Sequence, residues 1–282
     1  MQISVEAERS AFTAVAVPAA RSRASKAARD LWEGLLKYWL WGAMALQDIR
    51  LRYRGSLLGP FWLTFNTIIL IAMMGLLYPH LFHTSAHDYL PYLTIGMVVW
   101  QFIQTMINES GQTFWIAQNV ILQTPLPFSV FVYRTVARNF LILAHNVVIV
   151  PIVFVLMQVP VGVSALWVIP GFALLALNGV WIGLFFGMLC ARFRDISPIL
   201  ANMVQVLFFV TPVFWDPAAL GKWQAFVALN PLFDAVEVIR APLLGRSPEA
   251  LVWIVLLAVT AIGSIGTFTA FARFRARIAY WV

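Results

Sequence analysis

Long, uninterrupted runs of apolar residues dominate the chain from about residue 57 onward. A helix that crosses a membrane needs about 20 mainly apolar residues. Between Asn139 and Ala191 the chain contains no Asp, Glu, Lys or Arg. This stretch is too long for one crossing, and the Pro and Gly of QVPVGVSA (158–165) predict a tight turn that divides it into two helices. The pattern therefore predicts six spans, at about residues 57–82, 90–110, 139–158, 166–190, 196–215 and 250–271.

Residues 30–53, before the first span, have the pattern of an amphipathic helix. Glu33 and Lys37, like Asp48 and Arg52, are four residues apart in the order that stabilises a helix. A basic, Trp-rich helix at this place is typical of the membrane interface. Its apolar face comprises Trp32, Leu35, Leu36, Trp39, Ala43 and Leu46.

Residues 216–248 contain two apolar segments that are each too short to cross a membrane. They are interrupted by Asn230-Pro231 and again by Pro242 and Gly245. Because these segments lie between the fifth and sixth spans, we expect a re-entrant pair of helices that dips back from the outer surface.

Composition supports an all-α integral membrane protein. The chain is 61% hydrophobic and 11% charged, whereas soluble domains carry about 25% charged residues. The apolar runs do not alternate with period two, so barrel strands are not expected. The single cysteine, Cys190, excludes a disulfide framework. Residues 1–29 carry early charges and are rich in Ala and Arg, and we expect a disordered cytoplasmic extension there rather than a signal peptide.

The net charge of +7 is explained by the topology, and we expect no nucleic-acid partner. With the N-terminus inside, sixteen Lys or Arg lie in the inner segments, and only Lys222, Arg240 and Arg246 lie in the outer ones. Cytoplasmic loops of membrane proteins carry such an excess of basic residues. Both termini are therefore expected in the cytoplasm.

The sequence shows no catalytic constellation, so we expect no enzyme. It lacks the G-x-x-x-x-G-K-[ST] phosphate loop, and its one Gly-Lys pair, Gly221-Lys222, is followed by Trp. If transport is driven by ATP, another polypeptide must hydrolyse it. The spacing of His80, His83 and His87 near Asp88 would suit Zn²⁺ ligands. Polar residues at a membrane boundary explain it more simply, and we expect no metal.

Aromatic residues make up 15% of the chain. Aromatic faces stack on sugar rings, so a pathway lined with them would pass a glycan without gripping it, although any single aromatic residue also fits lipid-facing packing. The candidate pathway residues are Phe61, Trp62 and Phe65 in the first span, and Phe208, Phe209, Phe214 and Trp215 in the fifth.

Three stretches resemble the permease subunits of ABC-2-type polysaccharide exporters. RLRYRGSLLGPFW (50–62) resembles the start of their first span, and ARFRDISPILANMVQVLFFVTPVFW (191–215) resembles their fourth-to-fifth span junction. ALNPLFDAVEVIRAPLLG (228–245) resembles their outer re-entrant region. The three matches have the family's order and spacing and cover the chain from about residue 30 to its end.

The resemblance implies a homodimer in the inner membrane, bound to two copies of a separate ATPase that holds ATP and Mg²⁺, with no cofactor in this chain. The substrate would be a lipid-linked polysaccharide. Arg50, Arg52 and Arg54 stand where a lipid phosphate would enter, although positive-inside anchoring also explains them. The resemblance implies ATPase contact through the interface helix and through the loop after the second span, and the candidate coupling residues are Trp32, Trp39, Asp48, Leu122, Pro125, Pro127 and Arg134.

The exported glycan is left open between O-antigen, which we favour, capsular polysaccharide and teichoic acid. A second alternative is an exporter of drugs or small lipids with the same general fold. The third, a membrane-embedded glycan polymerase or ligase, needs large outer loops or acid and base residues within the membrane, and the chain offers few of either.

Overall fold

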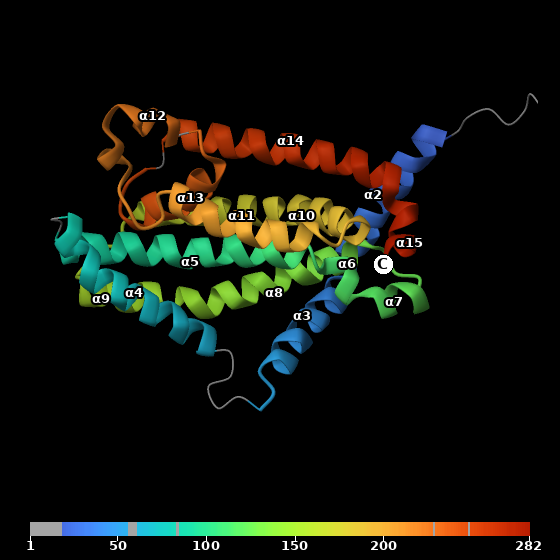
Figure 1. Ribbon diagram of the computed structural model, residues 1–282, viewed down its shortest axis with the longest axis horizontal. Helices are drawn as coiled ribbons and strands as arrows, with labels where there is room; N and C mark the ends of the chain where they lie inside the picture. Colours follow the sequence, from blue (N-terminus) through green and yellow to red (C-terminus); the bar gives the residue numbers. More distant parts are fainter. Residues whose placement is uncertain (1–18, 56–60, 83–84, 228, 248) are drawn as a thin grey trace, which may run out of the picture.

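The computed structural model describes residues 19–55, 61–82, 85–227, 229–247 and 249–282. Within these ranges the secondary structure is entirely helical (Figure 1). The first 18 residues of the predicted extension, the start of the first predicted span at residues 57–60, and His83 lie outside the described residues. The elements in chain order are α2 (Ala19–Leu36), α3 (Tyr38–Arg52), α4 (Phe61–Phe82), α5 (Ala86–Ser110), α6 (Thr113–Ile116), α7 (Gln118–Gln123), α8 (Ser129–Val147), α9 (Ile149–Leu156), η1 (Val163–Trp167), α10 (Val168–Arg192), α11 (Ile196–Val210), η2 (Pro217–Trp223), α12 (Gln224–Val227), α13 (Pro231–Leu243), α14 (Ala250–Phe274), η3 (Arg275–Arg277) and α15 (Ile278–Trp281).

Five helical segments of the described chain are long and apolar enough to cross a membrane. The predicted fifth span is shorter, because α11 ends at Val210 and not at residue 215. At 1.5 Å per residue its 15 residues extend about 22 Å, less than the roughly 30 Å of a bilayer's hydrocarbon core. The five segments are Thr64–Leu81, Ala86–Ser110, Ser129–Leu156, Val163–Arg192 and Ala250–Trp281.

Helix α5 lies at the centre of the bundle. It packs against α4, α8, α10, α11 and α13, and 72% of its most apolar part is buried in the protein. Its side chains supply much of the main core, including Leu93 and Trp100, which are almost completely buried. A second core near one end joins Phe114, Phe131 and Phe271 from α6, α8 and α14. This second core determines which helices are neighbours at that end of the bundle.

The N-terminal region differs from its prediction. The structure begins a helix at Ala19, so residues 19–29 of the predicted disordered extension are helical, and Ala27 is fully buried in the second core. The predicted single helix over residues 30–53 is two helices, because the backbone at Lys37 departs from helical geometry (φ −82°, ψ 40°). The bend lets α2 and α3 contact α8 at separate places.

The third span also begins earlier than predicted. Helix α8 starts at Ser129, ten residues before the predicted start of the span at residue 139, so residues 129–138 are helical. The predicted start at residue 139 is the start of the charge-free stretch, which Arg134 and Arg138 precede. In the structure both arginines are neutralised by carboxylates of other helices.

Figure 1 shows that α2, α7 and α15 lie at one end of the bundle and α12 at the opposite end. The segment between α11 and α14 returns into the bundle through α13, which packs against α5, α10 and α14. Arg240 of α13 is completely buried, and its Nη1 donates to the carbonyl oxygen of Pro212 at 3.0 Å. Its guanidinium also lies 3.9 Å from the ring centre of Tyr92. These contacts attach the segment after α11 to α13 and α5.

Candidate functional site

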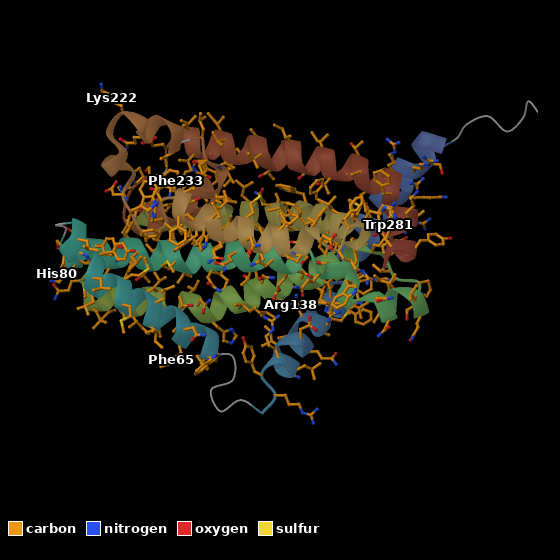
Figure 2. All side chains as sticks on the ribbon, viewed as in Figure 1. Phe65, His80, Arg138, Lys222, Phe233 and Trp281 are labelled. Atoms are coloured by element: carbon orange, nitrogen blue, oxygen red, sulfur yellow. The ribbon has the colours of Figure 1, made fainter. Side chains whose placement is uncertain are left out.

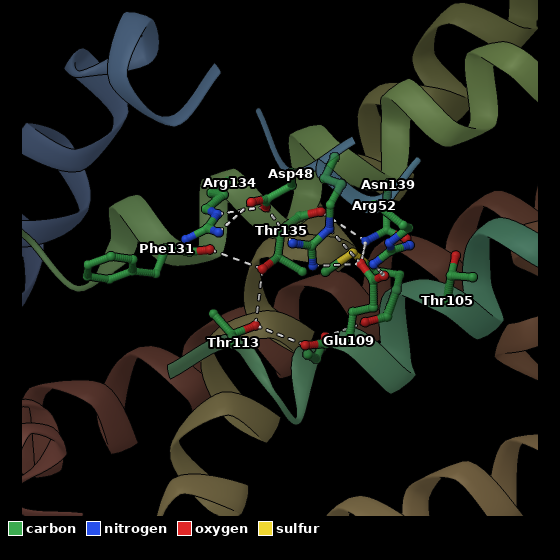
Figure 3. A network of polar contacts seen from close by, with 12 residues as sticks. Asp48, Arg52, Thr105, Glu109, Thr113, Phe131, Arg134, Thr135 and Asn139 are labelled. Carbon is green, nitrogen blue, oxygen red and sulfur yellow. Dashed lines mark hydrogen bonds and ion pairs between the residues drawn. The ribbon is translucent and has the colours of Figure 1, made fainter. Parts of the chain in front are cut away.

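A network of ion pairs joins α3, α5 and α8 near the end of the bundle that holds α2 and α15 (Figure 3). Asp48 of α3 accepts a hydrogen bond from Arg134 Nε at 2.7 Å and another from Arg134 Nη2. It also accepts one from Arg138 Nη1 at 2.6 Å. Arg134 and Arg138 are four residues apart and therefore lie on the same face of α8. Asp48 thus fastens the interface helix α3 to two turns of α8.

Arg138 connects this carboxylate to a second one on α5. Its Nε and Nη2 donate to Glu109 Oε2 at 3.0 and 2.8 Å. Glu109 also accepts from Arg52 Nη2 and from Asn139 Nδ2, each at 2.8 Å. One guanidinium thus bridges two carboxylates from two helices, which a planar fork of five donors allows. Figure 2 shows Arg138 pointing from α8 toward α3.

The network is largely shielded from solvent. The side chain of Arg138 is 7% exposed, and those of Asp48 and Glu109 are 14% and 16% exposed. Burial alone would raise the pKa of Asp48, but the hydrogen bonds and charges of Arg134 and Arg138 outweigh it and hold the pKa below its ordinary value. Charged hydrogen bonds of this kind are stronger than neutral ones, so the three helices are held together firmly.

A further carboxylate, Asp30 of α2, attaches the N-terminal helix to the start of α8. Its side chain is completely buried and accepts from the backbone N–H of Phe128 at 3.2 Å and of Ser129 at 3.0 Å. Arg275 Nε donates to the same carboxylate at 2.6 Å. Gly34 lies so close that a Cβ there would stand 2.0 Å from Ser129 Oγ. Asp30 therefore caps α8 and joins α2 to the segment after α14.

The predicted coupling residues fall into two groups. Asp48 and Arg134 bond to each other inside the chain, and Pro127 is buried. The others lie on the surface. Trp32 and Trp39 are 62% and 66% exposed, and both Leu122 and Pro125 are exposed. The exposed residues are the ones left accessible to a partner. Most of the predicted apolar face of residues 30–53 is exposed as well, including Leu36 and Leu46.

The three arginines of the predicted phosphate contact have different surroundings. Arg52 is engaged by Glu109, while Arg50 and Arg54 are exposed. Arg50 lies in the last turn of α3, and Arg54 lies in the turn that follows, beside Gly55 with its positive φ of 83°. Two of the three guanidinium groups therefore face outward at the junction between α3 and α4.

The aromatic residues of the predicted pathway form two separate groups within one chain. Phe61, Trp62 and Phe65 lie on the exposed face at the beginning of α4. The second group surrounds the end of α11, where the ring centres of Phe208 and Phe214 are 5.2 Å apart. Other contacts of this group include Phe208 with Phe209 at 5.3 Å between ring centres, Phe214 with Tyr78 at 5.5 Å, and Trp215 Nε1 donating to the carbonyl oxygen of Phe209 at 3.2 Å.

The histidine-containing segment after α4 is only partly described. Nδ1 of His87 lies 3.1 Å from a carboxylate oxygen of Asp88, and both side chains are exposed. His80 Nδ1 lies 2.9 Å from the carbonyl oxygen of Leu76 in its own helix. Among the described residues, no three His, Cys, Asp or Glu side chains are grouped so as to hold a metal ion.

Sequence reasoning missed the two residues that complete the network, Glu109 and Arg138. The sequence did contain a signal for this pair, because the predicted topology puts both residues at the inner membrane boundary. Glu109 ends the second predicted span on its inner side, and Arg138 directly precedes the charge-free stretch that begins at Asn139. Opposite charges at the same membrane boundary are candidates for pairing. Asp30 gave no comparable signal, because its partners Ser129 and Arg275 are far away in the sequence.

Comparison with known proteins agrees with this architecture. The ABC-2 type transporter family matches residues 40–244, more than half of the chain. Two proteins of Klebsiella pneumoniae named O-antigen export system permease protein RfbA are 25% and 24% identical over 196 residues, 67% of this chain and 74% of each relative. A protein of the same name from Myxococcus xanthus is 22% identical over 228 residues, 78% of this chain and 86% of the relative. The chain therefore belongs to the ABC-2 type transporter family of membrane transport subunits, and it is a multi-pass protein of the bacterial inner membrane.

Proposed function

We propose that the chain is the permease subunit of an ATP-driven exporter that moves a lipid-linked polysaccharide across the inner membrane. Among the candidate glycans, O-antigen is the substrate that we favour. The names of the three relatives supply the substrate class. The observation that carries the mechanism is the bridge made by Arg138 between Asp48 and Glu109, because it connects an exposed interface helix to two buried transmembrane helices.

The proposed membrane arrangement has six crossings, with both termini in the cytoplasm. The segment after α11 completes the fifth crossing, and α12 and α13 form the outer re-entrant region. Support comes from the gathering of α2, α7 and α15 at one end of the bundle (Figure 1) and from the sixteen basic residues of the predicted inner segments.

Single-cysteine labelling tests this topology. In a Cys190→Ser background, Lys222→Cys should react with a membrane-impermeant maleimide from outside the inner membrane. Arg194→Cys should react only after the membrane is opened. The reverse labelling pattern would refute the proposed orientation.

Two permeases and two ATPase subunits form the proposed complex, in which ATP and Mg²⁺ bind to the ATPase. The exposed residues Trp32, Trp39, Leu122 and Pro125 form the proposed contact surface. ATP binding closes the ATPase pair and displaces α3, and the Asp48–Arg138–Glu109 bridge carries this displacement to α8 and α5. The experiment compares Trp39→Ala with Tyr280→Ala, which removes an even more exposed aromatic side chain, on α15. Co-purification of the ATPase should fall only for the Trp39 variant, and equal retention would refute the surface.

The two aromatic groups line the proposed pathway together only when two chains face each other. The lipid phosphate is proposed to contact Arg50 and Arg54, since Arg52 is engaged by Glu109. Arg54→Ala should reduce export while leaving membrane insertion and ATPase assembly unchanged. Normal export by this variant would eliminate the phosphate contact and leave the arginines with an anchoring role.

Deletion of the gene tests the substrate. We expect lipid-linked O-antigen to accumulate on the cytoplasmic side and surface O-antigen to disappear. Selective loss of capsular polysaccharide or of teichoic acid would assign one of those glycans instead. Unchanged surface glycans combined with increased drug sensitivity would favour the exporter of drugs or small lipids, and unpolymerised glycan would favour a polymerase.

A further inference from the structure

A pocket of about 290 Å³ lies between the ends of α10 and α14, beside α15. Its volume is near the lower limit of the roughly 300 to 1,000 Å³ that is usual for ligand sites. The walls are apolar, and two arginines, Arg192 and Arg277, lie among them. Figure 2 places Trp281 at the end of the bundle where the chain terminates. The apolar lining residues are Phe185, Met188, Leu189, Phe193, Ala270, Phe274 and Trp281.

Arg192 and Arg277 hold positive charge at this pocket without an acidic partner. Each guanidinium stacks near an aromatic ring of the lining: Arg192 Cζ lies 5.9 Å from the ring centre of Trp281, and Arg277 Cζ lies 5.8 Å from that of Phe274. Neither forms a hydrogen bond or ion pair with any residue that the structure describes. Stacking leaves the in-plane N–H donors of a guanidinium free for a phosphate.

We propose that this pocket binds an anionic phospholipid of the inner leaflet. The phosphodiester accepts hydrogen bonds from Arg192 and Arg277, and part of an acyl chain lies against the apolar wall. Charge complementarity argues for this occupant, because the described lining contains two cations and neither Asp nor Glu. A zwitterionic lipid would bring its own cation close to the arginines. The proposal rests on the orientation given under Proposed function, which places this end in the cytoplasmic leaflet.

Ordinary positive-inside anchoring does not account for the arrangement. Arg194 lies two residues from Arg192 and is also exposed, but it does not line the pocket. Arg192 and Arg277 come from segments that are distant in the sequence and meet because α10 packs against α14 and α15. A general surface effect would treat all three arginines alike, whereas a built site distinguishes Arg194 from the other two.

The test measures lipid binding by the purified full-length protein with native mass spectrometry, using phosphatidylglycerol against phosphatidylethanolamine. A basic side chain near a membrane surface contributes roughly fivefold in affinity for anionic lipid. The double variant Arg192→Gln/Arg277→Gln should therefore bind phosphatidylglycerol about thirtyfold more weakly. Arg194→Gln is the matched control and should stay within about twofold of the wild type. A loss of about fivefold or more for Arg194→Gln, which a general surface effect predicts, would overturn the proposal.

A second variant distinguishes the binding of a lipid from the binding of free phosphate, and it controls for misfolding. Ala270→Phe fills part of the apolar wall and keeps both arginines, so it should weaken phosphatidylglycerol binding, and its thermal unfolding verifies the fold. Unchanged binding, or full displacement of the lipid by millimolar inorganic phosphate, would contradict an acyl-chain site. Tenfold preference for a polyprenyl phosphate over phosphatidylglycerol would overturn the assignment to a phospholipid. ATPase co-purification and export, measured on the same variants, report on the proposed function separately.

Discussion

Replacing Arg138 by Gln is the most direct test of the network between α3, α5 and α8. Arg138 donates one hydrogen bond to Asp48 and two to Glu109, at 2.6, 3.0 and 2.8 Å. Glutamine retains a polar group of moderate size but loses the positive charge and cannot reach both carboxylates. The variant therefore leaves two shielded carboxylates with fewer donors and removes the bridge between them.

The magnitude follows from the burial and from the donors that remain. Removing one partner of a buried ion pair costs about 3 to 5 kcal/mol. Asp48 keeps Arg134, and Glu109 keeps Arg52, so neither carboxylate is left unpaired. We therefore expect a loss in the free energy of unfolding at the low end, about 3 kcal/mol. For a protein of this size that corresponds to a fall in Tm of about 6 to 12 °C.

Thermal unfolding of the detergent-solubilised protein, followed by tryptophan fluorescence, measures this loss. Arg29→Gln is the matched control, because Arg29 pairs with Glu33 on the surface, with side chains 78% and 46% exposed. Such a pair contributes about 0.5 kcal/mol or less. Arg138→Lys keeps the charge without the planar fork and should fall between the two. A Tm for Arg138→Gln equal to that of the control would refute the structural role of the bridge.

Three further predictions concern other contacts. The pKa of Asp48 lies below its ordinary value, so its ion pairs stabilise the fold above about pH 4. This stabilisation is lost as the pH falls through the lowered pKa. Arg134→Gln should move the loss of stability to higher pH, which an acid titration followed by tryptophan fluorescence would detect. Asp30→Asn should weaken the capping of α8 and the bond to Arg275 by about 1 to 3 kcal/mol, and unchanged resistance of α2 to limited proteolysis would contradict this. Gln158→Gly should raise the free energy of unfolding by about 0.5 kcal/mol and raise Tm slightly, because Gln158 has a positive φ of 52° after α9. A lower Tm would show that the backbone at Gln158 is not strained.

The membrane helices with uniform apolar sequences were predictable. The predicted spans at about 90–110, 166–190 and 250–271 correspond to α5, α10 and α14, whose ends differ by only a few residues. Hydropathy alone locates such helices because every backbone group in lipid must be bonded within its own segment. The signal is local, so a single sequence contains it.

The beginning of α8 was not predictable in the same way. Arg134 and Arg138 end the apolar run in the sequence, but Asp48 and Glu109 neutralise them in the structure. These partners are 86 and 29 residues away from the arginines that they bind. Likewise, the break at Lys37 follows from two distant anchors on α8, and no Pro or Gly marks that position.

The candidate site shows the same limit. The sequence singled out Asp48 and Arg134 as residues that couple to the ATPase, and this role stays a prediction. Their mutual hydrogen bonds make them part of the chain's internal structure, while Trp32 and Trp39 stay exposed. Periodicity identifies the face of a helix on which a residue lies, but it does not identify what covers that face.

The network also determines which helix can move with α3 at the lowest cost. Displacing α3 away from α8 would break three hydrogen bonds to Asp48, so α3, α8 and α5 are expected to move as one unit. Helix α4 is held differently. Only 33% of its most apolar part is buried, against 72% for α5. Thr64 of α4 donates a neutral hydrogen bond to Asn146 of α8 at 3.1 Å. A neutral bond contributes about 1 kcal/mol, and a charged hydrogen bond of the kind that joins α3 to α8 is roughly twice as strong. We therefore expect α4 to slide along α8 more easily than α3 does. In the proposed exporter the opening motion then lies beside Phe61, Trp62 and Phe65, which are all exposed at the beginning of α4.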